Sequence, residues 1–137
     1  MSEYIQQAEE FLKRTGTVIK IRKKGVVEGF LFDNDKLPHI KYSVTLQRGL
    51  KRYSFPFYDS YYNYKENKEP SVYDILASLQ CYPIEENIDD FVNEFGYKIN
   101  NAADYNRVQR TWHNCRLQYN KLVNLFGLDI EQLREIQ

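Results

Sequence analysis

Three stretches of the chain alternate apolar with polar side chains, and this alternation constrains the fold more than any other feature. The stretches span residues 17–22, 40–47 and 52–57, and a turn at 48–51 separates the last two. Because successive side chains of an extended chain point to opposite faces, each stretch predicts a strand with one apolar and one polar face. The apolar set comprises Thr17, Ile19, Ile21, Ile40, Tyr42, Val44, Leu46, Tyr53, Phe55 and Phe57. We therefore expect a three-stranded antiparallel sheet that is covered on one side.

Two neighbouring segments extend this prediction. Residues 25–35 leave room for a short fourth strand around Phe30–Phe32. Pro56 has no amide hydrogen, so the third strand either lies at a sheet edge or ends there. Residues 59–70 are rich in turn-forming and charged side chains, which predicts a loop.

Helical periodicity appears on both sides of these strands. A first helix is expected from a cap at Ser2 to a left-handed residue at Gly16. After the strands, Ser71 and Asp74 have the spacing of a capping-box pair, and the helix that they begin is broken by Pro83.

The last part of the chain also predicts helices. A short one at 88–95 would end at Gly96, and the final one would follow a cap at Asp129. Between them, residues 101–126 carry apolar side chains at alternating spacings of three and four, as along a coiled-coil seam. The seam consists of Tyr105, Val108, Trp112, Cys115, Tyr119, Leu122 and Phe126. We expect it to cover the sheet with Trp112 near the centre of the core; the alternative use of the seam is a weak homodimer.

These patterns predict one α+β domain over residues 1–137, with an N-terminal helix, a three- or four-stranded sheet, and a helical half packed on one sheet face. The chain has 137 residues, 42% of them apolar, which suffices for one core. Basic and acidic residues number 19 each, so attraction to nucleic acid would need a local patch. The start of the chain has no secretory pattern and no apolar run is long enough to span a bilayer, so we expect a cytoplasmic protein.

No motif of a hydrolase, nucleotide-binding protein or metalloenzyme is present. The imidazoles are His39, expected at a surface turn, and His113. His113 lies two positions before Cys115 on the long helix, which turns the two side chains to different sides and excludes a dyad. Cys115 and Cys81 are expected as small buried side chains in helical surroundings. The sequence thus predicts a protein that is not an enzyme and uses no metal and no cofactor.

Charge is distributed unevenly along the chain. Residues 17–58 carry nine cations against three acids, a net charge of +6. Five of the cations are expected to share the polar side of the sheet: Lys20, Arg22, Lys24, Lys41 and Arg52. Such a face suits phosphate groups, so a small nucleic-acid-binding protein is the alternative function. Between residues 85 and 94 there are five acids and no cation. Glu86, Asp90 and Glu94 would form an acidic edge on one side of a helix, either for binding or as an ordinary solvated face.

Aromatic residues crowd the end of the third strand. Six of them lie between residues 55 and 64, and the last four are Tyr58, Tyr61, Tyr62 and Tyr64. Exposed tyrosine is common at protein-recognition surfaces because it offers a large area at a low entropic cost. We expect these four tyrosines to bind a partner protein, with folding back onto the domain as the alternative.

Residues 71–97, SVYDILASLQCYPIEENIDDFVNEFGY, resemble a group of small proteins encoded by phages and prophages of gut bacteria. The group has a core of the form YD-[IV]-L-A-x-L … F-x-x-E-F-G-Y. The matching residues are Tyr73, Asp74, Ile75, Leu76, Ala77, Leu79, Phe91, Glu94, Phe95, Gly96 and Tyr97. The TGT at 15–17, the YSVTL-x-R strand at 42–48 and the final helix rich in Tyr and Trp also fit, whereas the tyrosines at 58–64 depart from the group.

The resemblance implies a mobile-element accessory protein with no catalytic residues, of a kind that acts on host machinery. Inhibitors of CRISPR nucleases are a prominent class of such proteins, and an inhibitor needs only a complementary surface. We therefore expect a phage-encoded, anti-CRISPR-like inhibitor whose protein partner is a bacterial defence nuclease complex. It would act by occluding a surface of that complex, and its basic sheet and acidic edge would assist binding.

Overall fold

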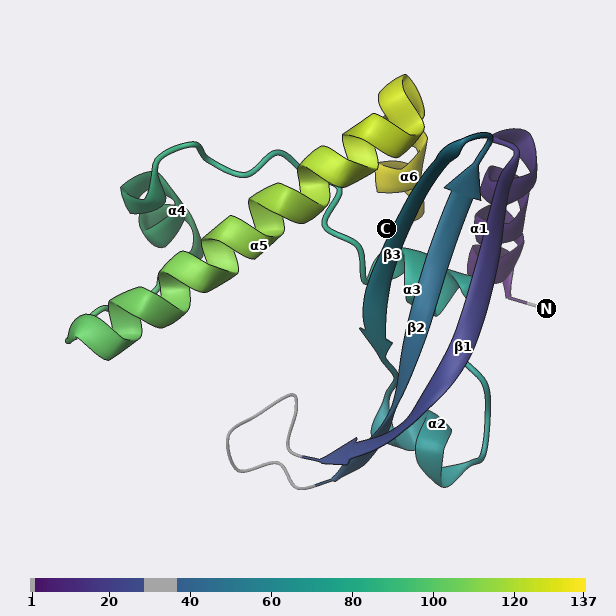
Figure 1. The fold of residues 1–137 in the computed structure, drawn as a ribbon, viewed down its shortest axis with the longest axis horizontal. Helices are drawn as coiled ribbons and strands as arrows, with labels where there is room; N and C mark the ends of the chain where they lie inside the picture. Colours follow the sequence, from purple (N-terminus) through teal and green to yellow (C-terminus); the bar gives the residue numbers. More distant parts are fainter. Residues whose placement is uncertain (1, 29–36) are drawn as a thin grey trace.

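The computed structural model describes residues 2–28 and 37–137. The elements are, in chain order, α1 (Glu3–Arg14), β1 (Thr17–Glu28), β2 (Pro38–Arg48), β3 (Lys51–Tyr58), α2 (Tyr61–Lys65), α3 (Val72–Ala77), α4 (Ile88–Phe95), α5 (Ala102–Phe126), a 3-10 turn η1 (Gly127–Asp129) and α6 (Ile130–Ile136). The predicted α+β architecture is confirmed, because helices from both ends of the chain pack against one face of an antiparallel sheet (Figure 1).

The sheet has the strand order β1-β2-β3, and both pairings are antiparallel. Its register aligns Ile19, Leu46 and Tyr53 across the three strands, so the apolar sets of the strands meet on one face. Gly49 adopts a φ of +62° in the tight turn between β2 and β3, a conformation that glycine reaches without strain. The fourth strand expected around Phe30–Phe32 falls on residues outside the described ranges, and within those ranges the sheet has three strands.

β1 is longer than predicted and carries a bulge. Lys23 pairs with Tyr42 and Gly25 pairs with Lys41, which leaves Lys24 as an extra residue in the ladder. A bulge increases the local twist of a strand. Because β1 forms an edge of the sheet, a bulge at Lys24 next to Lys23 discourages pairing with a strand of another chain.

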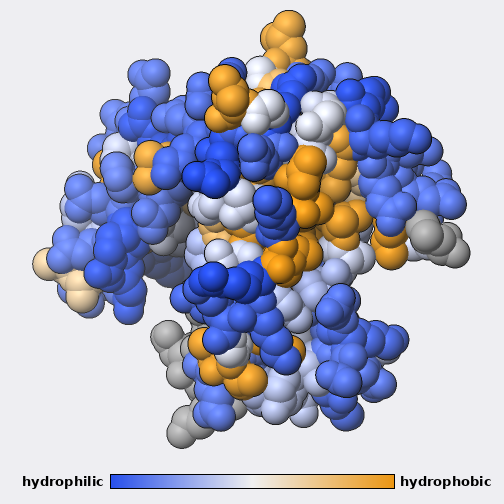
Figure 2. Space-filling view, turned by 45° about the vertical axis from the view of Figure 1, so that its right-hand side comes forward, coloured by the Kyte–Doolittle hydropathy of each residue, from blue (hydrophilic) through white to orange (hydrophobic). Residues whose placement is uncertain are grey.

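The core lies between the sheet and helices α1, α3 and α6, with the C-terminal end of α5. Phe11, Val44, Leu76 and Leu133 are fully buried members of it from four different elements. Each side chain of this kind contributes about 2 kcal/mol when it leaves water. The side displayed in Figure 2 is mostly hydrophilic, although apolar side chains gather in a band near its middle.

The long helix α5 covers the sheet with its last turns only. Leu122 and Phe126 are buried in the core, whereas the first half of α5 projects past β3 and packs against α4 (Figure 1). The prediction of Trp112 at the centre of the core is wrong: its ring is half-buried on the projecting half, where Nε1 donates to the Glu85 carbonyl at 2.7 Å. Heptad spacing identifies the apolar side of a helix but not how far the helix extends beyond its sheet. We call α4 together with residues 102–117 the helical arm.

The β2–β3 hairpin holds the C-terminal end of α5. Arg48 donates from Nη1 to the Phe126 carbonyl at 2.8 Å, and Lys51 donates to the Asn124 carbonyl at 2.9 Å. The last turn of α5 has no basic residue, so these two cations satisfy its carbonyls and oppose the negative end of the helix dipole. Arg48 also pairs with Asp129 at 2.6 Å. The prediction that the Asp129 side chain caps α6 is therefore wrong, because its carboxylate binds Arg48 instead.

Four other predicted helix ends are confirmed. Ser2 caps α1 by accepting the Tyr4 backbone N–H. Ser71 and Asp74 form the reciprocal capping box of α3, with both hydrogen bonds at 3.1 Å. Gly16 and Gly96 adopt positive φ angles after α1 and α4, as expected for residues that end helices.

The surroundings of Cys81 differ from the prediction. α3 ends at Ala77, well before Pro83, so Cys81 is buried in a non-helical segment. Its Sγ donates to Oε1 of Gln137 at 2.7 Å, and the amide nitrogen of Gln137 donates to carbonyls at the end of α3. The terminal carbonyls of α3, which have no donor within the helix, thus accept hydrogen bonds from the side chain of the C-terminal Gln137.

Candidate functional site

A one-turn helix, α2, takes the place of part of the loop predicted at residues 59–70. Ser60 begins the helix, because its Oγ accepts the Asn63 backbone N–H at 3.2 Å. Oδ1 of Asp59 supports the same turn by accepting from the Asn63 side chain at 2.9 Å and from the Ser60 backbone at 2.8 Å. Asp, Ser and Asn favour both loops and helix caps, so composition alone does not separate the two.

Two buried polar residues fix this turn to the sheet. Asp59 is 3% exposed, and its backbone N–H donates to the Ile40 carbonyl at 3.0 Å. His39 is 1% exposed, and its Nδ1 lies 2.9 Å from the Asp59 carbonyl oxygen. The prediction of His39 at a surface turn is wrong, because β2 already begins at Pro38 and the turn that carries Asp59 folds over its start.

The carboxyl group of Asp59 is held in an unusual state for an aspartate. Burial raises its pKa, and the nearby charge of Asp74 adds to the rise, whereas hydrogen bonds from Asn63 and Ser60 lower it in part. Oδ2 of Asp59 has no hydrogen-bond donor among the described residues. A buried acid in this position costs stability when it is ionised, so its use here points to a positional role.

The four tyrosines predicted as a partner-binding site surround this turn, and we call Tyr58, Tyr61, Tyr62 and Tyr64 the tyrosine surface. Tyr62 is 60% exposed and Tyr64 is 38% exposed, whereas Tyr58 and Tyr61 are half-buried. Tyr61 stacks on Tyr64 with their ring centres 6.3 Å apart. Nζ of Lys41 lies 5.7 Å from the ring centre of Tyr58. No residue of α2 is buried, so the helix presents its rings instead of contributing them to the core.

An open hollow adjoins the tyrosine surface. It has a volume of about 550 Å³ and lies between β3, α2 and α3. Tyr58 and Tyr62 line it together with two acids, Asp59 and Asp74. The hollow therefore has aromatic walls and negative charge nearby, a combination that suits a side chain inserted by a partner.

The register brings the predicted basic residues of the sheet together, and we call Lys20, Arg22, Lys24, Lys41 and Arg52 the basic face. They lie on the side of the sheet that is turned away from the core. Lys24 at the bulge lines a shallow hollow with Lys41 on this side. Their neighbours are uncharged: Ser43, Thr45, Gln47, Ser54 and Pro56.

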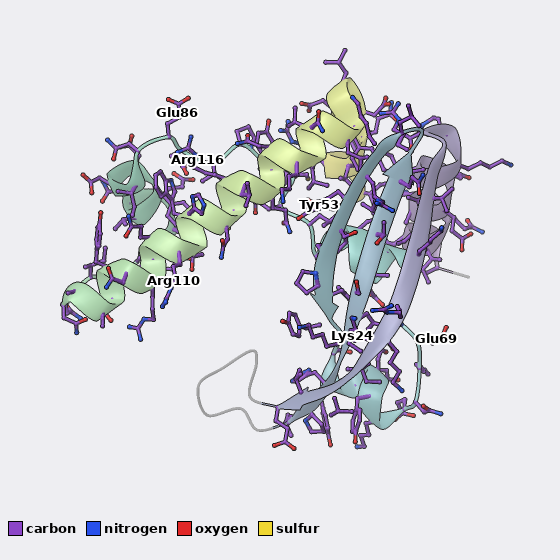
Figure 3. All side chains as sticks on the ribbon, in the orientation of Figure 1. Lys24, Tyr53, Glu69, Glu86, Arg110 and Arg116 are labelled. Carbon is purple, nitrogen blue, oxygen red and sulfur yellow. The ribbon has the colours of Figure 1, made fainter. Side chains whose placement is uncertain are left out.

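The predicted acidic edge is only partly assembled. Asp90 and Glu94 are exposed and lie four residues apart on α4. Glu86 precedes the helix, because Asn87 caps α4 by accepting the Asp89 backbone N–H, so the prediction of a common helical side for the three acids is wrong. In Figure 3 Glu86 lies beside Arg116 instead, whose Nη1 donates to the Glu86 carbonyl at 3.4 Å.

The residues considered for catalysis lie in three segments: His113 and Cys115 on α5, Cys81 in a non-helical segment and His39 on β2. His113 is exposed on α5, and burial raises the pKa of the half-buried Cys115 thiol. Burial also raises the pKa of the Cys81 thiol, which lies 34 positions before Cys115 in the sequence and donates a hydrogen bond to Gln137. Across residues 2–28 and 37–137, no group of three or more His, Cys, Asp or Glu side chains has the arrangement of a metal site. No helix in these ranges has the length and apolar character needed to cross a bilayer.

Sequence reasoning missed Asp59, the residue that anchors the tyrosine surface. The available signal was an Asp-Ser pair directly after a strand, followed by Asn63. This pattern is typical of a capped turn, but nothing in it reveals that the aspartate is buried against His39. Burial of that kind depends on which strand lies beneath the turn.

The comparisons with known proteins add no relative to these observations. No family model matches the chain, and no similar protein was found among curated proteins or solved structures.

Proposed function

We propose that this protein is a non-enzymatic binding protein that acts by covering a surface of a protein partner with its tyrosine surface. The observation that carries the proposal is the construction of α2. The helix contributes no side chain to the core, yet buried Asp59 and His39 hold it in one place. Buried polar groups used to fix an exposed aromatic turn are expected where the turn must be ready for recognition.

The tyrosine surface has the properties of a recognition hot spot. A tyrosine ring buries a large area while losing few rotamers, and a preorganised ring loses fewer still. Tyr62 is the most exposed of the four rings and also lines the hollow beside α2. A partner side chain in the hollow would contact Tyr58 and Tyr62 at once, which excludes water from the centre of the interface.

The resemblance of residues 71–97 to phage and prophage proteins supplies the class of partner. We propose a bacterial defence nuclease complex, with this protein as a phage-encoded, anti-CRISPR-like inhibitor in the host cell. An inhibitor of this kind acts by occlusion, so it needs affinity and shape but no reaction.

The binding step is tested by removing the exposed rings. Tyr62→Ser with Tyr64→Ser leaves the core untouched, so the fold is expected to persist while capture of the partner from host lysate falls at least tenfold. Tyr105→Ser is the matched control, because Tyr105 is 39% exposed on the helical arm and belongs to no proposed site. Equal capture by the double variant and the wild type, with circular dichroism unchanged in both, would refute the proposal.

The mode of action is tested on a purified CRISPR effector nuclease that the protein inhibits. Occlusion requires one inhibitor for each blocked surface, so activity should fall in proportion to the inhibitor added and end at a fixed molar ratio. Complete inactivation at a small fraction of that ratio would show turnover, and the non-enzymatic assignment would then be wrong.

A further inference from the structure

A second group of cations lies on the long helix α5. Between Tyr105 and Leu128 the chain contains no acid and four cations: Arg107, Arg110, Arg116 and Lys121. Arg110 and Lys121 are eleven positions apart, which is close to three full turns, so they lie on the same side of α5. Asn114 and Leu117 lie between them on that side, and all four residues are exposed.

This side of α5 starts at the edge of the sheet and continues along the helical arm. Nζ of Lys121 lies 5.7 Å from the ring centre of Tyr53 on β3. Figure 3 shows Arg110 farther out, on the side of α5 nearer to Lys24, whereas Arg116 lies on the opposite side near Glu86. Tyr53 belongs to the apolar set and packs against the core, so Lys121 lies on the core side of the sheet. Arg110 is therefore the cation of this helix side that lies toward Lys24 in Figure 3.

No negative charge interrupts either surface. Residues 17–27 and 37–58 contain eight cations and no acid. Among the described residues, the basic face forms no ion pair: the ion pairs join Arg48 to Asp129, Arg107 to Asp104 and Arg134 to Glu131. The protein has no net charge, so its acids are concentrated on other surfaces and leave this one strongly positive.

We propose that the basic face and the exposed Arg110 of α5 together bind the phosphate backbone of double-stranded DNA. The charges are spread too widely for a single phosphate. β1 has 12 residues and so extends over about 40 Å. α5 has 25 residues and extends over about 37 Å. A chain of regularly spaced phosphates can contact both elements, and each contact releases counterions.

The arrangement of aromatic rings favours a duplex over a single strand. Proteins that bind single strands stack bases on exposed aromatic rings. Here Tyr42, Phe55 and Phe57 point to the core side of the sheet, opposite the basic face, and offer no stacking platform. A projecting helix favours DNA over duplex RNA, because the major groove of B-DNA admits a helix and that of A-form RNA is too narrow.

Fluorescence anisotropy with a labelled 24-base-pair DNA duplex tests the proposal over a range of NaCl concentrations. Six contacts, five from the basic face and one from Arg110, predict a loss of about a thousandfold in affinity between 50 and 200 mM salt. Arg22→Gln with Lys24→Gln should reduce the slope of log affinity against log salt by about two, and Arg110→Gln should reduce it by about one.

The controls separate this surface from diffuse attraction and from the proposed function. Lys13→Gln with Arg14→Gln removes two exposed cations of α1 and should leave the slope unchanged. The variant Tyr62→Ser with Tyr64→Ser should bind the duplex as the wild type does, so protein capture and DNA binding can fail independently. The proposal is overturned by a lack of binding at 50 mM salt, by equal effects of the α1 pair and the Arg22 pair, or by tighter binding of single-stranded DNA or duplex RNA.

Discussion

Asp59 holds α2 in place, but burial of its carboxyl group makes the folded state less stable when that group is ionised. Its carboxyl is buried, and burial raises its pKa above the unfolded value. The folded protein therefore holds the Asp59 proton more tightly than the unfolded chain does. By linkage, the contribution of this group to stability is greatest below its unfolded pKa and is lost as pH rises through its folded pKa.

Asp59→Asn should remove this dependence. Asparagine keeps an oxygen for the N–H groups of Ser60 and Asn63 but does not ionise. We expect the free energy of unfolding of the variant, measured by urea titration, to increase relative to that of the wild type as the pH rises from 3 to 7. Glu9→Gln, which removes an exposed carboxylate of α1, should retain the wild-type dependence. A difference that is flat or of opposite sign would contradict the assignment.

Residues whose role depends on local spacing could be predicted from the sequence, whereas residues with distant partners could not. The Ser71–Asp74 box and Gly96 depend on neighbours within a few positions. Arg48 binds a carbonyl 78 positions away, and the sequence showed only a cation beside a turn. The tyrosine surface lies between these cases, because its rings are visible in the sequence but its anchor on Asp59 is not.

At the scale of elements, the fold depends on how the hairpin and α5 are joined. Arg48 connects β2 to three other segments: it donates to the carbonyls of Thr15, Leu125 and Phe126 and pairs with Asp129. Hydrogen bonds from a charged donor to carbonyls without other partners are among the stronger ones in proteins. The same contacts determine where the arm leaves the sheet.

Arg48→Ala should lower the free energy of unfolding by about 2 kcal/mol, since it leaves the carbonyls at the ends of α1 and α5 without their donor. Arg52→Ala is the matched control, because this exposed arginine of β3 has a similar place in the hairpin and no partner in the core; its expected effect is within about 0.5 kcal/mol. Chemical denaturation of the two variants measures the difference. Equal values would mean that the joint does not depend on Arg48.

The same scale explains why the strands and most helices were predictable and the reach of α5 was not. Alternation determines which side of a strand is apolar, and the register confirms it from Ile19 to Phe57. The seam of α5 is equally regular, but its Trp112 half packs on α4 and its Phe126 half packs on the core. A helix packs on α4 or on the core with the same apolar spacing, so periodicity in the sequence does not show which half of α5 packs on which.

The whole molecule consists of a well-buried body and a less protected arm. In the body, sheet and helices share one core, whereas the arm contains two buried side chains, Phe91 and Val108, and exposes Phe95 at 55%. Segments with few buried contacts open at lower free energies than the core. We expect the arm to unfold before the body.

The fluorescence of Trp112 can report the order in which arm and body unfold. Trp112 is the single tryptophan and lies on the arm, while the strands of the body dominate the loss of β-signal in circular dichroism. In a urea titration the midpoint from tryptophan fluorescence should fall below the midpoint from the β-signal. Trp112→Phe should abolish the fluorescence transition and leave the other midpoint in place. Coincident midpoints in the wild type would show that arm and body unfold as one unit.

Because α5 is attached to the sheet at its C-terminal end only, a small rotation there moves its N-terminal end over a larger distance. The helix is anchored by Arg48 and Lys51 and extends over about 37 Å, so a tilt of about 10° at the anchor displaces its far tip by roughly 6 Å. Small changes in the β2–β3 hairpin would thus alter the distance between the N-terminal end of α5 and the tyrosine surface. The residues of neither part would have to change. The distance between these two parts is therefore determined by residues 48–51, the turn that joins β2 to β3.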